Sequence, residues 1–184
     1  MIYLRVACFA AGNCEYENVL QHYGRMGDEI LNGHDMALHD RWGPGPLVAN
    51  VVQWNDYVIN STGAPGDLRA KCHTLWPDGK GVPVIMCNRG TQAPYGEVIN
   101  PTNLEANGGV QWYPYILINA QQLGAGGSTL IHELIHTTGL HSRDHDRDPS
   151  SAFYDNGLGN GQGRRKLSKA HAARLRGMYY AEKA

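Results

Sequence analysis

The pentapeptide His132-Glu133-Leu134-Ile135-His136 constrains this chain more than any other feature of its sequence. On an α-helix, residues four apart lie on one face, one turn from each other. Two imidazoles placed in this way bind one zinc ion at about 2.0–2.1 Å each. Glu133 is offset by one residue, so its carboxylate reaches water on the metal without becoming a ligand. The motif therefore predicts His132 and His136 as zinc ligands and Glu133 as a general base.

The residues around this motif predict a helix that faces the core. Leu134 and Ile135 lie within the motif, and further apolar residues precede it. Burying two imidazoles and a carboxylate among such side chains is costly without a metal, which weakens the alternative of incidental histidines on a core helix. Ser128 or Thr129 is placed to cap the start of the helix, and Gly139 to end it.

A third protein ligand is needed, because an open catalytic zinc site has three ligands from the protein and one water. His141 is the first choice, since it lies just past the end of the helix at Gly139. His145 is the second choice, and Asp144 or Asp146 the third.

Residues 126–142, Gly-Gly-Ser-Thr-Leu-Ile-His-Glu-Leu-Ile-His-Thr-Thr-Gly-Leu-His-Ser, resemble the zincin metallopeptidases. Gly139 and the Leu-His-Ser that follows it are similar to the metzincin branch. Ser142, however, stands in the register of the third metzincin histidine. The chain also has no Met between residues 141 and 177 for a Met-turn, and Phe153 is the candidate to replace it.

Other segments are similar to the aspzincins, the deuterolysin-like branch of the zincins. These are the lead-in Gly-Gly-Ser-Thr-Leu-Ile-His-Glu, the apolar run that ends in Cys87, and Tyr-Tyr-Ala-Glu at 179–182. The third ligand of that branch is an Asp thirteen residues after the first His, a position that His145 occupies here. The sequence leaves the two branches open.

The resemblance implies a zinc-dependent endopeptidase that hydrolyses peptide bonds in protein substrates. It also implies an α+β fold, with a small twisted mixed sheet, an active-site helix and a C-terminal helix in a single domain over residues 1–184. Zincins bind substrate as a strand added to a sheet edge, and residues 112–119 are the candidate edge strand. Tyr154 is a candidate for oxyanion stabilisation by analogy.

Two other functional classes stay open at this stage. One is a catalytically inactive zinc-binding or interaction protein on a peptidase scaffold, suggested by the displaced third ligand. The other is a delivered toxin or effector protease with one specific target.

Composition limits the partners and the compartment. A net charge of -1 argues against nucleic acid and anionic membranes as partners, and no apolar run reaches the roughly 20 residues of a membrane helix. Arg5 interrupts the apolar N-terminus, which favours a first strand over a signal peptide. Cys8, Cys14, Cys72 and Cys87 permit two disulfides in three connectivities. Together with the resemblance they favour a secreted protein over a cytosolic one with four buried thiols.

The acidic and basic residues that follow the motif support weaker hypotheses. Asp144, Asp146, Asp148 and Asp155 have the spacing of a calcium loop, although Pro149 stands where such a loop needs Gly. A solvated acidic loop is the stronger alternative. Residues 164–166, Arg-Arg-Lys, are expected to form a solvated approach to the last helix.

Periodicity and turn residues predict the remaining elements. The expected strands are residues 2–10, 82–87 and 112–119. A long helix is expected at 15–39, a break at 43–46, strand or mixed structure at 47–59, a loop up to about 110 and an irregular polar segment at 140–165. The last helix should be capped by Ser168 and should face inward at Leu167, Leu175 and Met178.

Overall fold

The computed structural model describes residues 1–10, 14, 27–46, 71–88, 90, 95–99, 114–122, 128–155 and 164–184. Within this part, one sheet of six strands forms the centre of the molecule. Its strands are β1 (Ile2–Ala10), β2 (Met36–Pro46), β3 (Val82–Cys87), β4 (Gly96–Ile99), β5 (Tyr115–Asn119) and β6 (Ala181–Lys183).

The sheet is mostly parallel. The strand order is β2-β1-β3-β5-β4, and the neighbours from β2 to β5 run parallel to one another. β4 is antiparallel to β5 and forms the outer strand on its side, while β6 pairs antiparallel with the start of β1. Every residue of β3 and β5 is buried, as expected for continuous apolar runs in a sheet that is covered on both faces.

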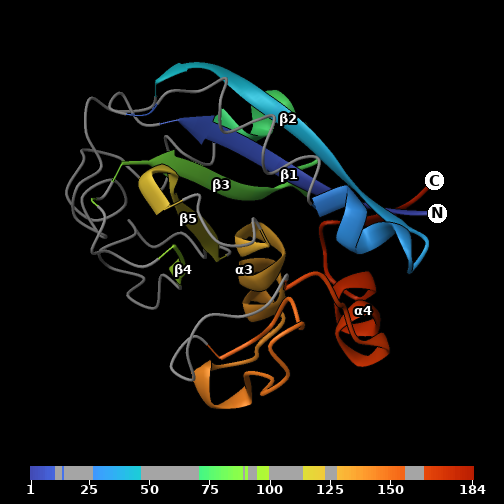
Figure 1. Cartoon of the computed structure of the whole chain (residues 1–184). Coiled ribbons are helices and arrows are strands. Elements are labelled where there is room, and N and C mark those ends of the chain that lie inside the picture. The colour runs from blue at the N-terminus through green and yellow to red at the C-terminus, as the bar shows by residue number, and fades with distance from the viewer. Residues whose placement is uncertain are drawn as a thin grey trace.

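Two helices occupy the same side of this sheet (Figure 1). α3 (Thr129–Thr137) packs against β4 and β5, and α4 (Lys169–Arg176) packs against α3 and β1. Ile131 and Leu134 of α3 share one buried cluster with Val84 of β3 and Ile116 of β5. The core therefore fixes the helix that carries the pentapeptide against the β4 side of the sheet.

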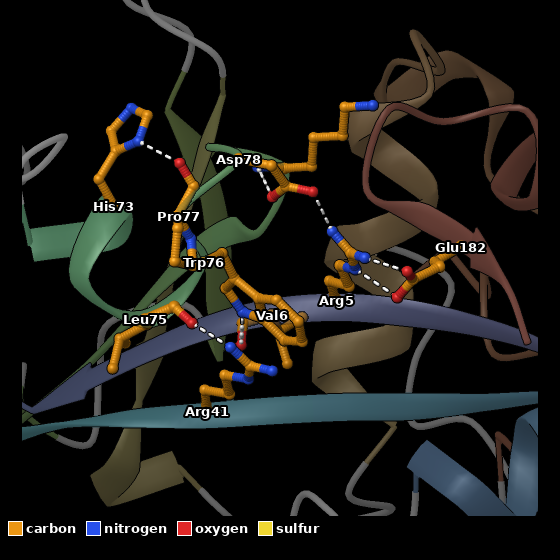
Figure 2. A network of polar contacts seen from close by, with 10 residues as sticks. Arg5, Val6, Arg41, His73, Leu75, Trp76, Pro77, Asp78 and Glu182 are labelled. Atoms are coloured by element: carbon orange, nitrogen blue, oxygen red, sulfur yellow. Dashed lines mark hydrogen bonds and ion pairs between the residues drawn. The ribbon is translucent and has the colours of Figure 1, made fainter.

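A polar network holds the first and last strands to the segment that precedes β3 (Figure 2). Arg5 on β1 forms ion pairs with Asp78, at 2.5 Å, and with Glu182 on β6. The indole of Trp76 donates a hydrogen bond to the carbonyl of Val6 at 3.2 Å, and the guanidinium of Arg41 lies 3.8 Å from the centre of the Trp76 ring. These contacts join both ends of the chain to the β1–β2 side of the sheet.

Several expected elements are confirmed. Strands cover residues 2–10 and 82–87, and a helix carries the pentapeptide. The side chain of Ser168 accepts a hydrogen bond from the backbone N–H of His171 and so caps α4. Helices combined with a mostly parallel mixed sheet are compatible with the expected α+β class.

Other expectations are wrong, and each error has a physical cause. Of the helix expected at 15–39, residues 15–26 lie outside the described residues. The described part ends early: residues 27–32 are helical, Asp35 adopts φ 54°, and the chain then enters β2 at Met36. The break expected at 43–46 lies inside β2. Among the described strands, β2 pairs with β1 alone and is therefore an outer strand. An outer strand tolerates proline because an N–H need not be donated there.

The loop expected up to residue 110 contains β4, a strand of four residues that gives too short a pattern to recognise. As a consequence the expected edge strand is also wrong, because β5 lies between β3 and β4. The 47–59 segment lies outside the described residues.

None of the four cysteines is joined in a disulfide in this structure, so the expected disulfides are not formed. Cys8 and Cys87 are buried on β1 and β3, and Cys72 is buried in the helical turn at 71–75. Burial raises the pKa of Cys72 to about 12, which keeps it a neutral thiol. Secretion stays a prediction. Among the described helices, none combines the length and apolarity that a membrane crossing requires.

Candidate metal centre

Three imidazoles converge at the end of α3 nearest the 140–155 segment. His132 and His136 come from successive turns of α3, and His145 follows the short 3-10 helix η3 (Ser142–Asp144). The Nε2 atom of His145 lies 3.1 Å from Nε2 of His132 and 2.9 Å from Nε2 of His136. In the described residues, these three are the His, Cys, Asp or Glu side chains that group closely enough to hold a metal ion.

The opposite ring nitrogens fix the orientation of two of these imidazoles. Nδ1 of His132 lies 3.0 Å from the carbonyl oxygen of Ala152, and Nδ1 of His136 lies 2.8 Å from that of Leu140. A carbonyl oxygen only accepts, so each Nδ1 carries the hydrogen and each Nε2 presents a lone pair. Nδ1 of His145 faces a carboxylate oxygen of Asp155 at 3.9 Å. Such partners set the direction and basicity of metal-binding histidines.

Burial keeps the three imidazoles neutral. It lowers the pKa of His132 to about 3, with further contributions from His136 and His145. Burial is also the main cause of the lowered pKa values of His136 and His145. Neutral rings whose lone pairs meet at about 3 Å repel one another unless a cation lies between them. The ligand nitrogens of a tetrahedral zinc ion are about 3.3 Å apart, so this donor set fits a metal ion.

Phe153 forms the floor of the cluster. Its ring centre lies 5.1 Å from that of His132, 4.8 Å from that of His136 and 4.7 Å from that of His145. The side chain is completely buried. The residue expected to replace the Met-turn side chain thus packs beneath all three histidines and limits their movement.

The structure does not bring His141, the first choice for the third ligand, into this group. Gly139 ends α3 with φ 97°, and His141 then precedes the turn of η3, where its backbone N–H donates to the carboxylate of Asp144 at 2.8 Å. His141 is exposed. After this turn the imidazole of His145, the second choice for the third ligand, lies beside that of His132.

The alternative acidic ligands have other partners. Asp144 accepts the hydrogen bond from His141, and Asp146 accepts one from the hydroxyl of Ser151 at 2.5 Å. Asp148 accepts from the backbone and hydroxyl of Ser150 at 2.9 and 2.7 Å. The carboxylates with calcium-loop spacing therefore serve separate local turns and do not gather around one point.

Glu133 lies beside the histidines but is not one of the grouped ligands. The residue is 95% buried, and its side chain rests against β4: a Cβ atom added to Gly96 would lie 3.1 Å from its Oε1 atom. Burial, with a smaller contribution from the charge of Glu97, raises the pKa of Glu133 to about 8. A carboxyl group with a pKa near neutrality is suited to accept and return a proton.

Tyr154 and Arg164 adjoin this centre. Tyr154 is buried next to Phe153, and its ring centre lies 5.6 Å from the guanidinium carbon of Arg164. The expected solvated approach is wrong for Arg164, which is 95% buried, whereas Arg165 and Lys166 are exposed. This difference could not be predicted from the sequence, because three successive basic residues form one uniform charged run.

Comparison of the sequence with protein-family models and with curated proteins finds no match. Inferences about function therefore depend on the chemistry of these side chains.

Proposed function

We propose that this chain is a zinc-dependent endopeptidase that hydrolyses peptide bonds in protein substrates. The observation that carries the proposal is the convergence of three neutral imidazoles beside a buried carboxylate. Nε2 of His145 lies within 3.1 Å of Nε2 of both His132 and His136, and Glu133 follows His132 directly in the chain.

Zinc is the metal that these ligands favour. Imidazole is a common ligand of zinc, copper, iron and nickel, and zinc is the one that accepts three protein ligands in a tetrahedral site without redox chemistry. When bound, a zinc ion supplies Lewis acidity, which acidifies water and polarises a carbonyl group. The His-Glu-x-x-His spacing and its resemblance to zincins support the same assignment.

The protein's own groups divide the remaining work. His132 and His136, held by the carbonyls of Ala152 and Leu140, bind the metal together with His145 and keep their Nε2 atoms directed at one point. Glu133 accepts a proton from the attacking water and returns it to the amine that leaves. A cation held beside Glu133 favours its ionised form, which counters the effect of burial on its pKa.

The edge strand β4 provides a place for an extended substrate. It is the outer strand of the described sheet on that side, and Glu133 rests against its first residue, Gly96. A peptide that adds to this edge by main-chain hydrogen bonds would bring its carbonyl groups past Glu133. The absence of a side chain at Gly96 leaves the Glu133 carboxylate its space.

The test is cleavage of casein by purified zinc-loaded protein, by the Glu133→Gln variant and by Glu29→Gln as a matched control. Glu29 is an exposed residue that pairs with Arg165. The proposal predicts cleavage by the wild type and the control, with a loss of about 10²–10⁴-fold in the Glu133 variant. Full activity of Glu133→Gln contradicts the assigned base. A zinc-loaded wild type that cleaves neither casein nor a broad peptide library contradicts general endopeptidase activity.

A further inference from the structure

Arg164 is a buried cation without a counter-ion among the described residues. The residue is 95% buried, and its Nε atom has no hydrogen-bond partner in the part of the chain that the structure describes. The charged and polar groups that act on its pKa are the hydroxyls of Tyr95 and Tyr154, and no carboxylate is among them. A buried guanidinium is expensive unless an anion or several acceptors compensate it.

The surroundings of Arg164 place it beside both halves of the proposed catalytic centre. Its guanidinium carbon lies 6.0 Å from the ring centre of Tyr95 and 5.6 Å from that of Tyr154. Tyr95 precedes Gly96, against which Glu133 rests, and Tyr154 follows Phe153, which underlies the three histidines. The charge of Arg164 is also close enough to His132 to contribute to its lowered pKa.

The two tyrosine rings hold the guanidinium without neutralising it. Contacts between a cation and an aromatic face are weakly attractive, so they orient the group and leave its charge available. The N–H groups of arginine match the two oxygens of a carboxylate. An anion that reached this position would remove most of the cost of burial.

We infer that Arg164, framed by Tyr95 and Tyr154, is a subsite that binds a carboxylate of the peptide substrate next to the bond that is cleaved. The inference depends on the proposed peptidase function and deepens it by naming a substrate class. The carboxylate belongs either to an Asp or Glu side chain or to the C-terminus of the peptide. Both sources present the same planar anion to the guanidinium.

The first experiment measures selectivity with the zinc-loaded full chain. Matched peptides carry Glu or Gln at single positions around the cleaved bond, or end in a free acid or an amide. The ratio of kcat/KM for each acid to its neutral partner is the readout. A ratio of at least about tenfold is expected for the wild type, and which pair shows it identifies the source of the carboxylate.

Variants then assign that ratio to one residue. Arg164→Gln is expected to bring the ratio close to one, and Arg164→Lys to keep part of it because the charge remains. Arg165→Gln is the matched control: it removes an exposed arginine that pairs with Glu29, and it should keep the wild-type ratio. A wild-type ratio near one for every pair overturns the inference, as does an unchanged ratio in a folded Arg164→Gln variant.

A binding measurement separates this inference from the proposed hydrolysis. The Glu133→Gln protein, loaded with zinc, is titrated calorimetrically with the same acid and neutral peptides. Tighter binding of an acid peptide by about tenfold supports the subsite even if the wild type cleaves nothing. Equal binding of both partners in every pair overturns the subsite even if the wild type is an active peptidase. Because this measurement requires no substitution at Arg164, it tests the carboxylate subsite even if Arg164→Gln fails to fold.

Discussion

Replacing Gly96 with Ala tests whether β4 holds Glu133 in position. The new Cβ atom would lie 2.7 Å from Cγ2 of Thr129, 2.9 Å from Cγ of Glu133 and 3.1 Å from its Oε1. Carbon atoms in ordinary contact are about 3.5–4.0 Å apart, so the first two approaches are too short by about 0.6–1.3 Å. Either the strand or the Glu133 side chain must move by a similar amount.

The expected effect is larger on catalysis than on stability. Adding one methyl group to a packed interior costs about 1–3 kcal/mol, because neighbouring groups shift. A displacement of about 1 Å at a catalytic group can lower the rate about 10²-fold. Zinc binding should be retained, since the three atoms nearest the added methyl group belong to Thr129 and Glu133, which are not among the proposed metal ligands.

Peptide cleavage, bound zinc and urea unfolding are measured on the same preparations. Gly33→Ala is the matched control, because nothing lies within 4 Å of a Cβ atom at that position. In a Glu133→Gln background, Gly96→Ala should cause little further loss, since both changes act on one group. Wild-type turnover by a stable Gly96→Ala protein would refute the positioning of Glu133 by β4, and so would full additivity of the two changes.

Three further predictions concern metal binding and stability. In the metal-free protein the pKa of Glu133 is about 8, against 4.5 for a glutamate exposed to solvent. Between these two pH values the folded state therefore keeps a proton that the unfolded state releases. The contribution of Glu133 to the free energy of unfolding is therefore full below pH 4.5 and is lost as the pH rises through 8. Glu133→Gln should remove this part of the pH dependence of the unfolding free energy measured in urea. Unfolding free energies of the wild type and the variant that change in parallel with pH would contradict this prediction. Phe153→Ala should lower the free energy of unfolding by about 3–5 kcal/mol and weaken zinc binding, measured in a competition with a chelator. A variant that binds zinc as tightly as the wild type would show that the Phe153 ring is not needed to position the three histidines. Tyr180→Phe removes a buried hydroxyl that lies 2.7 Å from that of Thr137, so unfolding should show a loss of about 1 kcal/mol; an unchanged midpoint would mean that this contact contributes nothing.

The local features of the fold could be predicted because local patterns determine them. Continuous apolar residues specify β3, and Ser168 specifies the start of α4 by accepting a backbone hydrogen bond. The edge position of β4 could not be predicted, because strand order depends on contacts between distant residues. Its four residues are also too few for a periodic pattern.

The metal centre likewise has one part that local sequence spacing predicts and one part that depends on the path of the chain. His132 and His136 are brought together by one helical turn, which sequence spacing reports directly. The third histidine depends on the path of η3, in which the carboxylate of Asp144 accepts from the backbone of His141 and the chain then returns at His145. Arg164 is buried and lies 6.0 Å from the ring centre of Tyr95, which is far from it in sequence, so a run of basic residues could not reveal its surroundings.

The metal content of purified protein tests the central claim most directly. The wild type, His145→Ala and His141→Ala are loaded with zinc, dialysed and measured for bound metal, and X-ray absorption at the zinc edge counts the imidazole ligands. Three converging histidines predict one zinc per wild-type chain with three nitrogen ligands at about 2.0–2.1 Å, retained in His141→Ala and lost or greatly weakened in His145→Ala. A wild type without stoichiometric zinc, or a His145→Ala protein that binds it as tightly as the wild type, would contradict this account.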